Sequence, residues 1–350
     1  MARSAQLGVV PGSASRELNE HLDCSVHSVF CLCESLSFAW VNDYLNCTRS
    51  TDKSLAFVIG GSTVETIRNL RALGSFFAAH PLTSDSPLGA WARFISWQFR
   101  SRLHKEILFD WIERQQLALQ HGMTGATMNV YVGLHEFADM MLPLHFLREG
   151  ELFLDIGANV GSYTVLASGI CRAKTWAFEP DPDTSRHLRR NIMVNKLDAL
   201  VTVHECALGA EQGEVGFTVG LDTVNRIAGA NDKRIRTVRL ERLDSVIADS
   251  QPIMLKVDVE GAEEGVLKGA AALLASPCLK VIELETVTSE SAKILKTNQF
   301  ERAYYDPFNR RLERDPIALT SFNSLFVRDW PFVADRLATA KKVEILGRSV

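Results

Sequence analysis

The chain has 350 residues, of which 46% are hydrophobic and 23% charged, and its formal net charge is −4. This length allows one large domain with an appended region, or two domains, and the composition is that of a globular protein. The weakly negative charge gives no reason to expect binding to nucleic acid or to an acidic membrane surface.

The chain contains seven cysteines, an odd number. Three of them stand singly inside apolar segments, which is typical of reduced, buried thiols. No apolar run reaches the ~20 residues of a membrane span, and residues 1–20 lack a basic-then-apolar signal pattern. We therefore expect a cytoplasmic protein without a membrane span. Cys31 and Cys33, near Cys24 and Cys47, are a weak metal-site candidate, because the second half of a zinc pattern is missing.

The first third of the chain carries the weakest pattern. Residues 1–80 include two stretches that predict helices, around 25–45 and 62–77, but no role. Pro81–Pro87 has the composition of a linker. From Leu88 to about Gln120, large apolar residues recur at helical spacing among arginines, which predicts one or two amphipathic helices packed on the core.

A short segment then leads into the main domain. Met128–Val132 alternates like a strand, and Phe137–Leu147 predicts a short helix. Because this segment directly precedes the first strand of the domain, Tyr131, His135 and Glu136 either overhang a ligand pocket or form a plain surface turn. The sequence does not decide between these two possibilities.

The strongest pattern begins with the apolar run Leu152–Ile156, which has the length of a buried parallel strand. Gly157 and Gly161 follow at once, and an apolar helix start comes next. Glycine permits positive φ and close approach of a ligand, and the start of a helix offers unpaired N–H groups. Strand, glycine turn and helix in this order are typical of a nucleotide-binding site. The alternative is a buried strand–turn–helix in which Asp155 only caps the helix.

The residues around the turn narrow the choice of nucleotide. A dinucleotide site needs a third glycine, and the Asp155 carboxylate would repel a phosphate. A second predicted strand ends at Glu179, about 20 residues after the glycine turn, where an acid accepts both hydroxyls of a ribose. Two acids and a glycine turn without a phosphate site fit S-adenosylmethionine. An NAD-dependent oxidoreductase is the disfavoured alternative.

A third apolar strand ends directly before Asp258. In open α/β sheets ligands bind at the carboxyl ends of the strands, so we expect Asp258 to lie level with Asp155 and Glu179. Glu260 and Glu263 fall on the first turn of the next helix, where the helix dipole favours acids. A purely structural role for Glu263 therefore stays open.

Strands and helices alternate from residue 152 onward, which implies an α/β fold with a mainly parallel sheet and helices on both faces. We expect strands at 152–156, 174–179, 200–206, 253–258, 279–285, 300–305 and 322–328. We expect helices at 161–171, 182–195, 241–249, 262–275 and 288–297. A hairpin and a loop are expected within 213–240, and a helical tail over 331–350.

Seven motifs follow one another along the chain: Phe153–Gly161, Ala177–Pro180, Asn191 with Asn195, Ala207–Gly209, Leu243–Asp244, Lys256–Glu263 and Asn323–Val327. Together they resemble the FkbM family of class I S-adenosylmethionine-dependent methyltransferases. The resemblance covers about residues 128–328 and implies a Rossmann-like, seven-stranded methyltransferase sheet with the last strand antiparallel. We expect four parts: a mainly helical N-terminal region (1–80), a helical cap segment (81–147), the methyltransferase domain (148–330) and a tail (331–350).

The resemblance also implies residue roles. Nine residues would bind the cofactor: Asp155, Gly157, Asn159 and Gly161 the methionine part, Glu179 the ribose, and Pro180, Asp181, Cys206 and Ala207 the adenine. Cys206 stands where the family often has a polar residue, which leaves adenine recognition open there. Asp258 would face the acceptor, and the implied reaction is methyl transfer to a hydroxyl of a sugar, glycan or polyketide-like natural product.

An alcohol oxygen must lose its proton as it attacks the methyl group, so a base within hydrogen-bond reach is expected. Asp258 is the first choice, with Glu260 and His135 as alternates. Lys256 is expected to pair with Asp258 and keep it ionised, although a plain ion pair is the alternative.

Two further alternatives stay open. Five acids have the oxygen ligands that suit Mg²⁺: Asp258, Glu260, Glu263, Glu283 and Glu285. A metal-independent reaction is nevertheless favoured. The chain would otherwise be a scaffold that keeps the cofactor fold without catalysing, with residues 1–120 holding a partner. The acceptor and the oligomeric state are not given by the sequence.

Overall fold

The computed structural model describes residues 63–220, 225–229 and 231–350. The chain divides into two compact units, residues 1–76 and 77–350. Helix α3 (Thr63–Ala79) begins in the first unit, where a helix is expected around 62–77. The helix expected around 25–45 and the four cysteines of the weak metal candidate lie outside the described residues. Within the described part of the chain, no helix is long and apolar enough to cross a bilayer.

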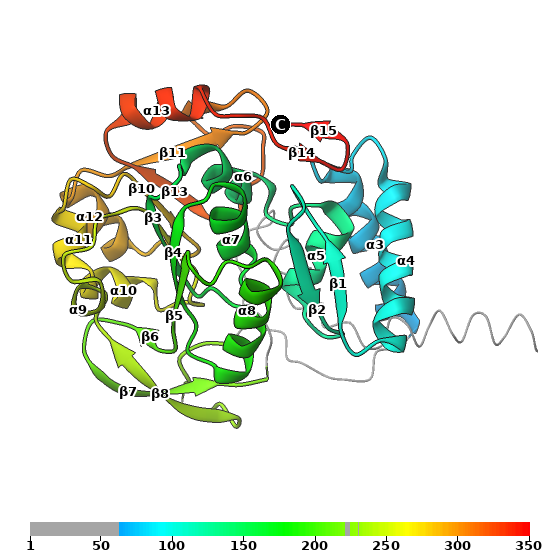
Figure 1. The fold of residues 1–350 in the computed structure, drawn as a ribbon, viewed down its shortest axis with the longest axis horizontal. Helices are drawn as coiled ribbons and strands as arrows, with labels where there is room; N and C mark the ends of the chain where they lie inside the picture. Colours follow the sequence, from blue (N-terminus) through cyan, green and yellow to red (C-terminus); the bar gives the residue numbers. More distant parts are fainter. Residues whose placement is uncertain (1–62, 221–224, 230) are drawn as a thin grey trace, which may run out of the picture. The chain divides into compact units, whose positions relative to one another are not determined.

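The second unit is built around an eight-stranded sheet in the order β12-β11-β13-β10-β9-β3-β4-β5 (Figure 1). The strands are β3 (Leu152–Ile156), β4 (Lys174–Phe178), β5 (Val201–His204), β9 (Pro252–Val257), β10 (Val281–Leu284), β11 (Glu301–Asp306), β12 (Arg311–Glu313) and β13 (Ser324–Val327). The strands from β5 to β10 pair in parallel, and β13 runs antiparallel to both β10 and β11. The seven expected strands and the antiparallel last strand are confirmed. Strand β12 is an eighth strand that was not predicted, because its three residues include a single apolar side chain.

Helices cover both faces of this sheet, as expected. Figure 1 shows one group beside the strands β3 to β5 and a second group on the opposite side. The first group is α6 (Phe137–Phe146), α7 (Ser162–Val165) with its π-helical continuation η1 (Leu166–Ile170), and α8 (Pro182–Val194). The second is α9 (Leu243–Ile247), α10 (Glu263–Gly269), α11 (Ala271–Ala275) and α12 (Ser289–Thr297).

Alternate residues of the central strands enter two separate apolar clusters. Phe153 and Met254 belong to the cluster that includes α6, whereas Leu154 and Leu255 belong to the cluster that includes α10. Strands buried on both faces read as continuous apolar runs rather than as alternating patterns. This double burial is the reason why the runs at 152–156 and 253–257 are apolar at every position except Asp155 and Lys256.

The segment before the domain differs from the prediction. Helix α4 (Pro87–Leu103) is present, but the rest of the expected helical stretch is the antiparallel hairpin of β1 (Ile107–Asp110) and β2 (Gln116–Leu119). The strand expected at 128–132 is wrong, because these residues end helix α5 (Thr124–Val132). Both faces of the last two turns of α5 are buried, so its polar and apolar residues do not alternate between core and solvent.

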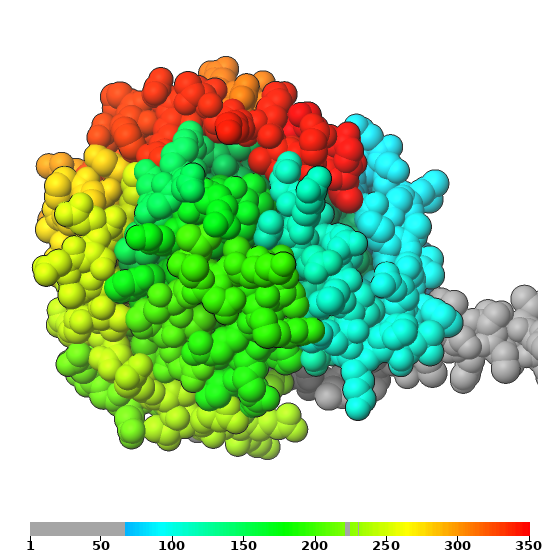
Figure 2. Space-filling view, in the orientation of Figure 1, coloured from blue at the N-terminus to red at the C-terminus, as the bar shows by residue number. Residues whose placement is uncertain are grey.

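The hairpin owes its conformation to partners far along the chain. The Asn195 side chain exchanges two hydrogen bonds of 2.7 Å with the backbone of Gln116. The Asn191 amide accepts from Ala118 N at 2.6 Å and donates to Val160 O at 2.7 Å. Figure 2 shows the surfaces of the hairpin (cyan) and of α8 (green) in contact. These two asparagines therefore fasten β2 to α8, and Asn191 also fastens it to the glycine turn.

The remaining elements complete the unit. A small sheet pairs β6 (Ala207–Leu208) with β8 (Ile235–Glu241) in parallel and β8 with β7 (Gly213–Thr218) antiparallel, so the hairpin expected within 213–240 is confirmed. The tail is only partly helical: α13 (Trp330–Ala338) is followed by a hairpin of β14 (Glu344–Ile345) and β15 (Arg348–Ser349).

Candidate active site

Strand register brings the predicted residues to one edge of the sheet. Ile156 pairs with both Phe178 and Val257, and Val257 pairs with Leu284. The residue after each of these four positions leaves the carboxyl end of its strand. In sheet order these residues are Glu179, Gly157, Asp258 and Glu285. The edge therefore carries a glycine turn between acids, in the place where parallel α/β sheets bind ligands.

Asp155 lies two residues deeper in the sheet than the edge at which it is expected. It pairs in register with Lys256, and Lys256 pairs with Glu283 on the next strand. Asp155 is 1% exposed, and its carboxylate accepts a 2.6 Å hydrogen bond from Thr164 Oγ1. Burial raises the pKa of Asp155, and Lys256 opposes this shift. The expectation that Asp155 stands level with Glu179 and Asp258 is wrong, because it precedes the last residue of its strand while the other two follow theirs.

The glycine turn leaves no room for a side chain. Gly157 has φ +78°, and a Cβ there would lie 1.8 Å from the carbonyl oxygen of Asp258. Gly161 has φ +92°, and its Cβ would lie 2.5 Å from Leu188 Cδ1. Asn159 adopts a left-handed φ of +50°, which asparagine tolerates better than most residues. At Gly157 the turn is therefore packed directly against the backbone of Asp258.

Glu179 is tied to the same turn through its carboxylate. One oxygen accepts from Asn159 N at 3.0 Å and the other from Asp181 N at 2.9 Å. The side chain is buried, and this burial raises the pKa of Glu179 to about 8 although the two N–H donors oppose the shift. The acid is thus positioned by backbone groups and keeps lone pairs for further donors.

The residues expected around the adenine differ in how they are held. Asp181 caps α8 by accepting from Thr184, and it pairs with Arg236 at 2.8 Å. Cys206 and Ala207 are both buried and belong to apolar clusters. Pro180 is half-buried between Glu179 and Asp181.

A buried ammonium group lies below the edge. Lys256 is 2% exposed, and its Nζ lies 2.6 Å from Asp258 Oδ2 and 4.5 Å from the centre of the Tyr163 ring. Burial alone would lower the pKa of Lys256, but Asp258, Glu136 and Asp155 outweigh it and raise the pKa. The expected pairing of Lys256 with Asp258 is therefore present.

The segment before the first strand contributes to this cluster. Glu136 Oε2 accepts from the Tyr163 hydroxyl at 2.5 Å and from Asn323 Nδ2 at 3.5 Å. Asp139, one turn further along α6, accepts from Phe322 N at 2.8 Å and from Ser321 Oγ, and so holds the loop before β13. Burial raises the pKa of Asp139 to about 7. The pattern alone did not select Tyr163 or Asp139. Tyr163 follows the glycine turn directly, and this position was the available signal.

His135, an alternate base, is a poor one in this structure. Burial lowers the pKa of His135 to about 3, with a further contribution from His80. Tyr131 hydrogen-bonds to Gln98 at 3.1 Å and is buried among aromatic rings. Tyr131, His135 and Glu136 were expected either to overhang the pocket or to form a turn. By the contacts described above, Glu136 is the one of the three that is hydrogen-bonded to Tyr163, whose ring lies against Lys256.

Three of the five acids considered for Mg²⁺ come together. Ligand oxygens of Asp258, Glu260 and Glu285 lie within 4.8 Å of one another. Glu263 instead accepts from the backbone N–H groups of Val259 and Gly261, at 3.3 and 3.1 Å, which is the structural role left open above. Glu283 is 1% exposed and lies in the deeper row beside Lys256. Burial and the nearby Asp258 raise the pKa of Glu285 to about 9.

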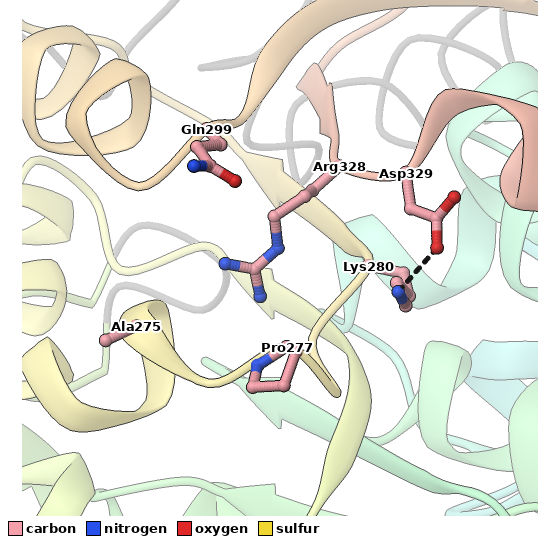
Figure 3. Close-up of a pocket in the computed structure, with 6 residues that line it drawn as sticks. All are labelled: Ala275, Pro277, Lys280, Gln299, Arg328 and Asp329. Atoms are coloured by element: carbon pink, nitrogen blue, oxygen red, sulfur yellow. Dashed lines mark hydrogen bonds and ion pairs between the residues drawn. The ribbon is translucent and has the colours of Figure 1, made fainter.

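A separate cavity of about 340 Å³ lies at the opposite edge of the sheet (Figure 3). It is lined by Ala275, Pro277, Lys280, Gln299, Arg328 and Asp329. Lys280 pairs with Asp329 at 2.7 Å, and Arg328 donates to the backbone carbonyls of Leu274, Ser276, Leu279 and Asn298. Its cations are thus occupied by the protein itself, and the arginine serves the ends of α11 and α12.

Comparison with known proteins agrees with this geometry. Residues 155–305 match the family model of the methyltransferase FkbM domain. This stretch is an FkbM methyltransferase domain. The chain is 27% identical over 146 residues to the hexuronic acid methyltransferase AglP of Haloferax volcanii, which covers 41% of this chain and 59% of that protein. It is 28% identical over 154 residues to the ribosomal protein L11 methyltransferase of Chloroflexus aurantiacus, covering 42% and 45% of the two chains.

Among solved structures, an FkbM methyltransferase from Methylobacillus flagellatus matches with 17% identity and a TM-score of 0.35, over 75% of this chain and 60% of that one. The chain spans about half to two thirds of the length of the curated relatives that it matches.

Proposed function

We propose that the FkbM domain is an S-adenosylmethionine-dependent O-methyltransferase that acts on a hydroxyl of a sugar, glycan or polyketide-like natural product. The observation that carries this proposal is the row of Glu179, Gly157 and Asp258 at the carboxyl edge, with Gly157 packed against the Asp258 backbone. The site has carboxylates and a turn with two glycines, whereas a dinucleotide site has a third glycine and binds a pyrophosphate.

The residues present fit the cofactor. Gly157, Asn159 and Gly161 would hold the methionine part and Glu179 the ribose, while Pro180, Asp181, Cys206 and Ala207 would border the adenine. Asp155 would act from below through Thr164, since its carboxylate is buried. S-adenosylmethionine, when bound, supplies a methyl group that is already activated by its sulfonium, so placement of the acceptor provides most of the rate.

Asp258 is the acid expected to face the acceptor, and the Lys256 ammonium lies 2.6 Å from its Oδ2. Glu260 lies two residues further on with φ +54°, and its N–H donates to Glu285 Oε2 at 3.3 Å. The relative named for hexuronic acid methylation favours a sugar acceptor over a polyketide-like one.

The test is transfer of labelled methyl from S-adenosylmethionine to a panel of glucuronic acid, galacturonic acid, glucose and a phenolic polyketide. Label that appears on the sugars and survives mild alkali is an ether, as the proposal expects. Label that alkali removes is a methyl ester and would move the reaction to a carboxyl oxygen. Normal cofactor binding without any transfer would favour the non-catalytic scaffold.

A further inference from the structure

We infer that Glu136, rather than Asp258, takes the proton from the acceptor hydroxyl. This inference rests on the proposed function and names a catalytic residue from outside the stretch that matches the family model, which begins at residue 155. It is carried by the hydrogen bonds around Lys256.

Glu136 is half-buried at the start of α6, with one oxygen held and one open. Its Oε2 accepts from the Tyr163 hydroxyl at 2.5 Å and from Asn323 at 3.5 Å. Its Oε1 receives no hydrogen bond from the residues that the structure describes. This oxygen is also not among the fully buried side-chain atoms that lack a hydrogen-bond partner. A carboxylate oriented through one oxygen and accessible at the other has the geometry of a general base.

Asp258 is engaged on both sides. Lys256 Nζ donates to its Oδ2 at 2.6 Å, and Glu285 shares a hydrogen bond with it. These contacts occupy the Asp258 carboxylate, whereas Glu136 Oε1 has no hydrogen-bond partner among the described residues and is left for the acceptor hydroxyl. We therefore assign Asp258 to orienting the acceptor, as a positioning residue, and leave proton removal to Glu136.

The electrostatic surroundings agree with this division. Burial raises the pKa of Glu136; Lys256 opposes the shift, the charge of Asp258 adds to it, and the Tyr163 and Asn323 donors lower it. A base works best when its pKa lies near the working pH, so this shift improves Glu136 for the task. The low pKa of His135 removes the other base on this segment.

The acceptor oxygen forms a bond to the methyl carbon, the carbon–sulfur bond breaks with its electron pair left on sulfur, and the hydroxyl proton passes to Glu136 Oε1. Tyr163 keeps the carboxyl group oriented while it is protonated. Solvent then removes the proton, which the half-buried position of Glu136 permits.

The first test needs no acceptor. In protein labelled with ¹³C at the glutamate side-chain carboxyl, the Glu136 resonance is identified by its loss in Glu136→Gln. We expect it to titrate above 4.5, the ordinary value for glutamate, and to move further up in Tyr163→Phe, because a donor to the ionised form is lost. A resonance that titrates at or below 4.5, or that ignores Tyr163→Phe, would overturn the inference.

The second test measures methyl transfer to an acceptor on which the wild-type enzyme is active, and compares the wild type with variants. Glu136→Gln should reduce kcat by about 10²- to 10⁴-fold and remove the acidic limb of its pH profile, while the affinity for S-adenosylhomocysteine changes less than about threefold. Tyr163→Phe should keep the limb but shift it to higher pH. Glu264→Gln changes a half-buried glutamate that pairs with Lys268; it is the matched control and should leave both readouts unchanged.

The outcomes separate the two proposals. If wild type transfers no methyl group to any acceptor, the proposed function fails and the titration still decides the state of Glu136. If wild type is active and Glu136→Gln keeps the acidic limb, or Asp258→Asn alone removes it, the assignment of the base is wrong. Should Glu136→Gln fail to fold, Glu136→Asp replaces it, because a shortened carboxylate should lower kcat while keeping a limb.

Discussion

The two edges of the central sheet carry charged groups that are used in opposite ways. At the amino edge, Arg328 donates to four backbone carbonyls and Lys280 pairs with Asp329, so each cation is satisfied by fixed protein partners. At the carboxyl edge, Lys256 is surrounded by four carboxyl groups, those of Asp258, Glu136, Asp155 and Glu283. At the amino edge each cation has its partners within the protein, whereas at the carboxyl edge the carboxyl groups outnumber the single ammonium of Lys256.

The difference teaches that a cavity lined by charged groups is not sufficient to mark a site. The amino edge has the cavity, but its arginine completes helix ends. The carboxyl edge has acids whose pKa values are raised by burial, among them Glu179 at about 8 and Glu285 at about 9. Acids kept in this state are expected where a ligand is to supply the missing donors or positive charge.

The largest effect should come from closing the turn at the carboxyl edge. Gly157→Ala would place a Cβ 1.8 Å from Asp258 O at a φ of +78°, so we expect at least ~100-fold weaker binding of S-adenosylhomocysteine in calorimetry. Gly150→Ala is the matched control, because Gly150 has φ +79° but no atom within 4 Å of its Cβ. The control should cost about 1–2 kcal/mol of stability and keep full affinity. Equal loss of affinity in both variants would contradict the close approach.

The second effect concerns two cations, the buried Lys256 and the half-buried Arg328. Lys256→Met should lower the free energy of unfolding by about 3–5 kcal/mol, since it leaves buried acids uncompensated. The loss should be larger at pH 8 than at pH 5, because Glu136, Asp155 and Glu283 have raised pKa values and hold protons more tightly folded than unfolded.

Arg328→Met is the comparison at the amino edge. It removes donors to four carbonyls and should cost about 3 kcal/mol, with the same loss at pH 5 and pH 8 and no change in cofactor affinity. Denaturant unfolding at both pH values checks the pair. A pH-independent loss for Lys256→Met would show that the acids around it are not coupled to it.

A smaller effect is expected at Asn191, whose side chain links the β1–β2 hairpin to the glycine turn. Asn191→Ala removes hydrogen bonds to Ala118 N and Val160 O and should cost about 2–3 kcal/mol, because both partners are buried. Asn298→Ala loses a single bond to Ile294 O and should cost about 1 kcal/mol. Thermal unfolding compares the two. Identical shifts would mean that Asn191 is not a special link.

The smallest effect should come from a chelator. We expect the methyl-transfer rate to stay unchanged in EDTA, since Lys256 already neutralises Asp258. A loss of rate that Mg²⁺ restores would instead assign the cluster of Asp258, Glu260 and Glu285 to a metal ion.

Much of this arrangement was predictable from the sequence, for reasons that particular residues make plain. Apolar runs that stop directly before Gly157, Glu179 and Asp258 predict the strands and their common edge, because alternating strands and helices form a parallel sheet. The deeper row of Asp155 was missed, since pattern gives strand position but not register.

The hairpin β1–β2 and helix α5 were missed for a different reason. Their conformation depends on partners far along the chain, such as Asn191 and Asn195 for β2, and local periodicity does not contain that information. Glu136 was an open possibility for the same reason: its partners Tyr163 and Asn323 are 27 and 187 residues away.

The central claim is that the carboxyl edge binds S-adenosylmethionine and not a dinucleotide. Calorimetric titration of the full chain with S-adenosylhomocysteine, alongside NAD, tests it most directly. We expect micromolar binding of S-adenosylhomocysteine, none of NAD, and loss of the first in Gly157→Ala but not in Gly150→Ala. Binding of NAD, or of neither ligand, would contradict the account and would leave the glycine turn as an element of architecture only.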